Sequence, residues 1–177
     1  VEKPISLYAA TKRTDELFGY TYAHLFGIPS TGLRFFTVYG PWGRPDMAAF
    51  LFTRAIVAGR PIRVFNHGEM WRDFTYIDDI VQGVLRALDR PAEGTPPVKI
   101  YNLGGDKVEK LTDEIGLSEQ ARQRKAVMKM EPLQPGDVPA TCADIAASRR
   151  DLGFEPTTPI SAGIPKFVEW YKDFYGA

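Results

Sequence analysis

Residues 31–39 read TGLRFFTVY, and residues 40–46 continue as GPWGRPD. The first run is rich in aromatic and β-branched residues. Toward its end apolar residues fall on both faces, as in a strand of a covered parallel sheet. The second run holds two glycines and two prolines in seven residues, which predicts a shaped loop. Since ligands of open α/β sheets bind at the carboxyl ends of the strands, this loop is a candidate ligand-binding element.

An amphipathic helix is predicted before that strand, over about residues 7–26, with Gly27 and Pro29 ending it. Tyr8 and Lys12 lie four residues apart near its beginning and therefore share one face. A neighbouring ammonium lowers the pKa of a tyrosine, which can then accept a proton from a sugar or alcohol hydroxyl. The spacing alone equally allows a half-buried tyrosine beside a solvated lysine.

The rest of the chain alternates predicted helices and strands. Helices are expected over residues 47–58, 78–88, 110–124, 145–152 and 160–175, and further strands over residues 62–65, 98–103 and 126–130. About four strands and six helices predict an α/β protein: the C-terminal part of a Rossmann-like, doubly wound parallel sheet plus a small mixed lobe. We assign residues 1–60 to the sheet domain and residues 61–177 mainly to the substrate-binding lobe, with residues 72–103 returning to the sheet.

Acidic residues occupy notable positions in two of these helices. Asp78 and Asp79 stand at the start of the third predicted helix and are expected to cap it rather than to catalyse. In the fourth, Glu114, Ser118 and Arg122 occupy positions where an apolar stripe would continue, so we expect weaker local stability there.

The composition narrows the class of protein. The 177 residues carry 22 basic and 22 acidic side chains, so bulk charge predicts neither nucleic-acid nor membrane binding. No apolar run approaches the length of a membrane span. The single cysteine, Cys142, excludes an intrachain disulfide and indicates a reducing, cytoplasmic compartment. We expect it to be a small buried or neutral residue rather than a nucleophile. His24 and His67 lack ligand-type partners at metal spacing, so no metal site is predicted.

Four stretches, in this order, carry a family resemblance: SLYAATK at 6–12, LRFFTVYGP at 33–41, RDFTYIDDI at 72–80 and QPGDV at 134–138. The chain resembles the extended short-chain dehydrogenase/reductase family of NAD-dependent nucleotide-sugar epimerases and dehydratases. Through YGPWGRPDMA at 39–48 it is most similar to the UDP-glucuronate 4-epimerases. The resemblance covers essentially the whole chain but only the C-terminal half or so of a family member. It implies NAD as cofactor, a UDP-sugar as substrate and a homodimer of the full-length protein.

The resemblance also implies residue roles. Tyr8 takes the proton from the sugar 4-hydroxyl while hydride passes to the nicotinamide, and Lys12 lowers the pKa of Tyr8 and holds the nicotinamide ribose. Phe35 and Val38 lie at the nicotinamide pocket, and Thr37 faces the hexose. The residue types themselves leave Phe35 equally compatible with plain core.

Arg44, Arg72 and Asp137 complete the implied substrate-binding set. Two guanidiniums on opposite loops suit a pyrophosphate, because arginine forms bidentate, charge-assisted bonds with phosphate oxygens. Asp137 is implied to hold the uridine ribose. Each has a plainer alternative: Arg44 paired with Asp46, Arg72 paired with Asp73, and Asp137 as an ordinary turn residue.

The chain also departs from the family pattern. The Gly-x-x-Gly-x-x-Gly turn that binds the dinucleotide is absent, and Gly104-Gly105 does not replace it. The serine or threonine partner of the catalytic tyrosine is expected upstream of Val1, and Gln134 stands where related epimerases often carry arginine. We therefore expect part of a longer protein that binds NAD weakly or not at all by itself. Its abrupt start could also be an expression or processing artefact.

Three functions remain open at this point. The first is epimerisation at C4 of a UDP-sugar, most simply UDP-glucuronate to UDP-galacturonate, through a 4-keto intermediate. The second is another reaction of the same family, 4,6-dehydration or decarboxylation of a UDP-uronate. The third is a non-catalytic nucleotide-sugar-binding or dimerisation module.

Overall fold

The computed structural model describes residues 2–176, and its elements run as follows. The helices are α1 (Leu7–Phe26), α2 (Ala48–Ala58), α3 (Ile77–Leu88), α4 (Leu111–Arg122), α5 (Ala146–Leu152) and α6 (Ile160–Tyr175), with one 3-10 turn, η1 (Phe65–Gly68). The strands are β1 (Ser30–Phe35), β2 (Thr37–Tyr39), β3 (Pro61–Val64), β4 (Trp71–Tyr76), β5 (Val98–Leu103), β6 (Val108–Lys110) and β7 (Val127–Met130).

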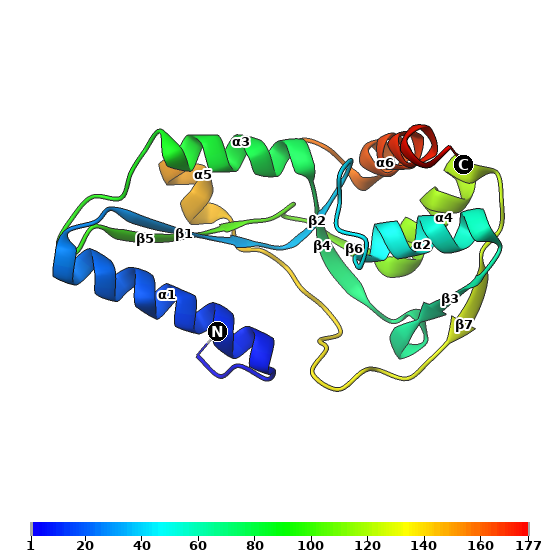
Figure 1. The fold of residues 1–177 in the computed structure, drawn as a ribbon, viewed down its shortest axis with the longest axis horizontal. Helices are drawn as coiled ribbons and strands as arrows, with labels where there is room; N and C mark the ends of the chain where they lie inside the picture. Colours follow the sequence, from blue (N-terminus) through cyan, green and yellow to red (C-terminus); the bar gives the residue numbers. More distant parts are fainter. Residues whose placement is uncertain (1, 177) are drawn as a thin grey trace.

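The strands pair mainly in parallel, as an α/β fold requires. β1 pairs with β5, β2 with β4 and β3 with β7, all parallel, while β6 joins β4 antiparallel. In Figure 1, α1 lies on one side of the β1–β5 pair and α3 and α5 lie on the other, whereas α2, α4 and α6 gather at the opposite end with β3 and β7. Helices on both sides of parallel strands confirm the predicted Rossmann-like α/β class.

The start and end of α1 explain why its bounds were predictable. The Ser6 hydroxyl accepts a hydrogen bond from the Ala9 N–H at 3.1 Å and caps the first turn. At the other end Gly27 adopts a left-handed conformation, with φ of 65°, and its N–H bonds to the Ala23 carbonyl. The predicted helix over residues 7–26 is confirmed.

The prediction of one strand over residues 31–39 and of about four strands in total is wrong. The chain changes partner at Phe36, whose N–H donates to the Leu103 carbonyl at 3.2 Å before β2 turns to β4. β4 escaped detection because its buried positions include the polar residues Asp73 and Thr75, which breaks the apolar pattern of a buried strand. β6 has only three residues and gives no periodic signal.

Two further sequence predictions are also wrong. The N-cap position of α3 is Tyr76, so Asp78 and Asp79 lie inside the first turn and do not cap it. Asp79 is buried and accepts hydrogen bonds from a distant part of the chain instead. The buried alternative for Cys142 is wrong as well, because Cys142 is exposed while the next residue, Ala143, is buried.

Two apolar clusters hold the described residues together. One joins α2, α4 and α6 with β3 and β4, and the other joins α3 and α5 with β5. Glu114 and Ser118 of α4 are fully buried, so the predicted break in the apolar stripe is a pair of polar side chains inside the core. These clusters do not by themselves test the division near residue 60, which stays a prediction. No helix within residues 2–176 combines the length and apolarity needed to cross a membrane.

Candidate functional site

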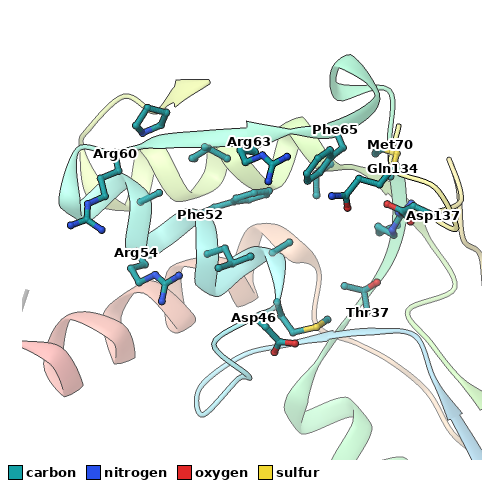
Figure 2. Close-up of a pocket in the computed structure, with 18 of the residues that line it drawn as sticks. Thr37, Asp46, Phe52, Arg54, Arg60, Arg63, Phe65, Met70, Gln134 and Asp137 are labelled. Atoms are coloured by element: carbon teal, nitrogen blue, oxygen red, sulfur yellow. The ribbon is translucent and has the colours of Figure 1, made fainter. Parts of the chain in front are cut away.

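A pocket of about 840 Å³ lies between α2, β3 and β4, and we call it the α2/β4 pocket. Apolar side chains from the three elements, among them Phe52, Ile62 and Phe74, line it. Figure 2 shows Gln134 and Asp137 together at one end of the pocket and the arginines of α2 and the following turn at the other. An apolar lining with a few convergent polar groups is typical of a small-molecule binding site.

Arg72 and Asp137 form an ion pair on the wall of the α2/β4 pocket. The Arg72 Nη2 lies 2.8 Å from the Asp137 Oδ1, and the Arg72 side chain is only 16% exposed. Arg72 Nη1 also donates to the Trp71 and Pro139 carbonyls, at 2.8 and 3.3 Å. The alternative in which Arg72 pairs with Asp73 is therefore wrong. A guanidinium fixed in this way is oriented before any anion arrives.

Arg44 lies differently, on the exposed loop after β2. Its Nη2 lies 2.6 Å from the Asp46 Oδ2 and its Nε 3.1 Å from Oδ1. The hydrogen bond from Arg44 holds the pKa of Asp46 below its ordinary value. Asp46 lines the α2/β4 pocket, whereas Arg44 is not among the residues that line it. The structure therefore shows the plainer alternative for Arg44, an ion pair with Asp46. An ion pair this exposed contributes little to stability.

A second cavity, of about 870 Å³, lies between α1 and the β1–β5 pair, and we call it the α1/β1 hollow. Tyr8, Lys12 and Phe35 all line it. The Lys12 Nζ lies 5.9 Å from the centroid of the Tyr8 ring and 2.8 Å from the Asp15 Oδ2. That bond to Asp15 is the main reason why the pKa of Lys12 is raised. Tyr8 is 69% and Phe35 52% exposed, so neither is a core residue.

A two-bond ion pair fixes α1 against β1 within the same hollow. Arg34 Nε donates to the Glu16 Oε1 at 2.6 Å and Arg34 Nη2 donates to Oε2 at 2.9 Å, while Arg13 binds Oε2 at 2.7 Å. The hydrogen bond from Arg34 is the largest cause that lowers the pKa of Glu16 to about 2. The helix that carries Tyr8 and the strand that carries Phe35 are thereby joined.

One stretch of backbone connects the two cavities. Phe35 lines the α1/β1 hollow and Thr37, two residues further on, lines the α2/β4 pocket. Two steps of an extended chain span about 7 Å. Val38 lines neither cavity and packs against the second apolar cluster.

Sequence reasoning missed two residues of the α2/β4 pocket, Arg63 and Phe65. The Arg63 Cζ lies 4.9 Å from the centroid of the Phe65 ring, and both side chains line the pocket. Figure 2 shows the two side by side. They alternate with the buried residues Ile62 and Val64, and that period of two in the sequence was the signal that could have revealed them.

Comparison with known proteins decides the family. Residues 1–104, more than half of the chain, match the NAD dependent epimerase/dehydratase family. This chain belongs to that epimerase/dehydratase family. The motifs quoted above had predicted that membership, and it is confirmed.

Several members of the epimerase/dehydratase family are similar over nearly all of this chain. UDP-glucuronate 4-epimerase 2 of Arabidopsis thaliana is 46% identical over 187 residues, which cover 98% of this chain and 43% of that protein. Protein CapI of Staphylococcus aureus is 46% identical over 189 residues, covering 99% of this chain and 57% of CapI. The chain thus spans about half the length of the curated relatives it matches.

A solved family structure has the same fold. The UDP-glucuronic acid 4-epimerase from Bacillus cereus, in complex with UDP-glucuronic acid and NAD, is 33% identical with a TM-score of 0.90. The match covers 98% of this chain and 55% of that one. Across residues 2–176 no group of three His, Cys, Asp or Glu side chains is arranged to hold a metal ion.

Proposed function

We propose that this chain is the C-terminal, substrate-binding portion of an NAD-dependent UDP-glucuronate 4-epimerase. The observation that carries the proposal is the placement of Thr37 in the α2/β4 pocket two residues from Phe35 in the α1/β1 hollow. A sugar beside Thr37 is then within reach of the hollow that Tyr8 and Lys12 line. The similarity to UDP-glucuronate 4-epimerases over nearly the whole chain supports the same reaction.

In this proposal the α2/β4 pocket takes the UDP part of the substrate. Arg72, oriented by its bonds to Asp137 and to backbone carbonyls, meets the diphosphate, and Asp137 accepts a bond from the uridine ribose. Arg44 joins the diphosphate by exchanging its exposed bonds to Asp46 for phosphate oxygens. Thr37 faces the hexose.

Proton transfer is assigned to Tyr8. Its side chain is exposed, the Lys12 ammonium lies 5.9 Å from the centroid of its ring, and in this proposal Tyr8 accepts the proton of the sugar 4-hydroxyl. After a 4-keto intermediate has formed, Tyr8 returns a proton to the sugar oxygen. When NAD is bound, Lys12 would also hold its nicotinamide ribose.

The described residues fit the nicotinamide end of NAD. An exposed aromatic ring, a phenol and an ammonium line one concave surface, and Tyr8, Lys12 and Phe35 would hold that end. The chemistry that NAD supplies when bound is acceptance and return of hydride at the sugar C4. The sequence lacks the glycine turn that holds the pyrophosphate of NAD. We therefore propose weak or no NAD binding by this chain alone.

Calorimetry on this chain tests the proposal directly. We expect UDP and UDP-glucuronate to bind and NAD to give no measurable heat. Absence of UDP binding would overturn the assignment of the α2/β4 pocket, and tight NAD binding would overturn the division of the active site. Incubating the full-length protein with UDP-glucuronate, and resolving the products, separates 4-epimerisation from dehydration or decarboxylation.

We further propose that the full-length protein is a cytoplasmic homodimer. Several large apolar residues on the outer surface of α1 are each more than half exposed, namely Leu17, Phe18, Tyr22, Leu25 and Phe26. A contiguous apolar surface on a helix is typical of a protein interface. Light scattering on the full-length protein should give twice the monomer mass, and a monomer at micromolar concentration would contradict the homodimer.

A further inference from the structure

The carboxylate of Asp73 is fully buried on β4 and joins three parts of the chain. One oxygen accepts a short hydrogen bond from the Gly105 N–H and a longer one, at 3.4 Å, from the Thr75 hydroxyl. The other oxygen accepts from the Ala143 N–H at 2.9 Å. The N–H of Asp73 itself donates to the Thr141 hydroxyl at 3.3 Å. A buried carboxylate needs such partners, because burial without them is strongly unfavourable.

These bonds close a segment of extended chain onto β4. The Trp71 N–H donates to the Pro139 carbonyl at 2.8 Å, and the Thr141 N–H donates to the Trp71 carbonyl at 3.2 Å. Trp71 and Ala140 also form a parallel bridge. Residues 139–143, which we call the clamped segment, are separated from Asp137 by the single residue Val138. The position of Asp137 in the α2/β4 pocket therefore depends on how the clamped segment is held.

The turn after β5 packs closely against β4, the clamped segment and the same carboxylate. A Cβ atom added to Gly104 would meet first the Ala143 Cβ and then the Asp73 Oδ2 at 3.0 Å, and one added to Gly105 would meet first the Phe74 carbonyl oxygen and then the Asp73 Oδ1 at 3.2 Å. The two glycines therefore leave the space that the clamped segment, the β4 backbone and the carboxylate occupy together. The Gly104-Gly105 pair does not belong to a dinucleotide-binding motif. The close packing of this turn explains why both residues are glycine.

Neighbouring residues of β4 face opposite ways, since side chains alternate along a strand. Arg72 lines the α2/β4 pocket, while Asp73 is buried against the clamped segment. One face of β4 therefore carries Arg72, the cation of the pocket. The other face carries Asp73, which anchors the clamped segment that lies close in the chain to Asp137, the acidic partner of Arg72.

We propose that Asp73 is a positioning residue for nucleotide binding: it holds the clamped segment on β4 so that Asp137 stays paired with Arg72. This inference rests on the proposed function, because it takes the α2/β4 pocket to be the UDP site. Without the anchor, Asp137 and Arg72 keep their chemistry but lose their fixed separation.

The chain offers a matched control in Asp79. That carboxylate is also buried and accepts backbone bonds from a distant segment, from Thr157 N–H at 3.1 Å and Thr158 N–H at 3.0 Å. The segment it holds carries none of the proposed binding residues. Asp73→Asn and Asp79→Asn therefore make the same chemical change at two different anchors. Each replaces a carboxylate that accepts hydrogen bonds from two backbone N–H groups with an amide.

The first readout is UDP affinity, measured by calorimetry well below the melting temperature of each variant. We expect Asp73→Asn to weaken UDP binding about tenfold, the effect of one lost charged hydrogen bond, and Asp79→Asn to leave the affinity unchanged although it also lowers the melting temperature. Equal UDP affinity in the unaltered chain and in Asp73→Asn would overturn the role of Asp73 but leave the proposed function standing. If the unaltered chain binds no UDP, the proposed function fails as well.

The second readout does not need a ligand. Hydrogen exchange should become faster at residues 138–143 in Asp73→Asn but not in Asp79→Asn, and unchanged protection of residues 138–143 would overturn the inference. Should Asp73→Asn fail to fold, Thr141→Val removes only the hydroxyl that accepts from the Asp73 N–H. That variant should weaken UDP binding about threefold and speed the same exchange.

Discussion

Glu16 of α1 and Arg34 of β1 meet through two hydrogen bonds, 2.6 and 2.9 Å long, although 18 residues separate them in the sequence. The Glu16 side chain is 14% exposed, so this ion pair is partly shielded from water. It fixes the helix of the proposed proton acceptor Tyr8 to the strand of Phe35. The geometry of the α1/β1 hollow thus depends on a charge pair as well as on apolar packing.

The Glu16–Arg34 pair should make the fold sensitive to acid. The pKa of Glu16 is lowered from 4.5 to about 2 in the folded chain, so its contribution to stability is present above pH 4.5 and is lost as the pH falls toward 2. Glu16→Gln should lower the free energy of unfolding by about 1–3 kcal/mol at pH 7. In this variant the free energy of unfolding should also fall less steeply between pH 4.5 and 2. Urea titrations from pH 2 to 7 measure both. The exposed Glu169→Gln is the control, and the same loss in both variants would contradict the prediction.

Glu114 should act in the opposite direction. Burial raises its pKa from 4.5 to about 8, and neither carboxylate oxygen has a hydrogen-bond partner among residues 2–176. The folded state therefore keeps its proton while the unfolded state loses it, and the free energy of unfolding falls as the pH rises from 4.5 to 8. The slope should approach about 1.4 kcal/mol per pH unit.

Two variants of Glu114 separate charge from packing. Glu114→Leu should remove the pH dependence and raise the melting temperature at pH 8, because an apolar side chain suits the surrounding cluster. Glu114→Gln should also remove the pH dependence but gain less stability, since an uncharged polar group stays buried. A slope that persists in both variants would assign the titration to another group.

Arg72 should matter for UDP more through its shape than through its charge. Arg72→Lys keeps the positive charge but loses the planar fork that reaches Asp137 and the Pro139 carbonyl. We expect UDP binding to weaken about tenfold in Arg72→Lys and further in Arg72→Ala, measured by calorimetry. Arg90→Lys, on a guanidinium that bonds the distant Asp151 carbonyl, is the control. An affinity unchanged in Arg72→Lys would argue against the diphosphate role.

Tyr8→Phe tests the proton transfer in the full-length protein. The Tyr8 ring is largely exposed, so its hydroxyl can be removed with little effect on stability. We expect kcat for epimerisation to fall by at least about 100-fold while KM for UDP-glucuronate changes little. A fall of the same size in Tyr22→Phe, on the same helix, would point to a structural effect instead.

Local signals in the sequence were sufficient for some elements and not for others. The bounds of α1 could be predicted because a capping serine, an apolar period and a terminal glycine agree. β4 could not, because Asp73 is buried by bonds to segments far away in the sequence, and the buried Thr75 donates to the Asp73 carboxylate. Its place in the sheet is a property of the assembled fold.

The candidate site divides in the same way. Tyr8 and Lys12 could be paired from a spacing of four on one helix, and the structure does bring them together in one hollow. Arg72 and Asp137 are 65 residues apart, and only the folding of the clamped segment onto β4 brings them within 2.8 Å. No spacing rule reaches that far.

The single residue Phe36, where the chain leaves β5 for β4, has a consequence for how this protein can evolve. Phe35 and Thr37 stand on either side of Phe36 and line different cavities. An insertion or deletion at Phe36 would turn Thr37 to the opposite face while every side chain kept its identity. Natural variation in this stretch should therefore change residue types and preserve length.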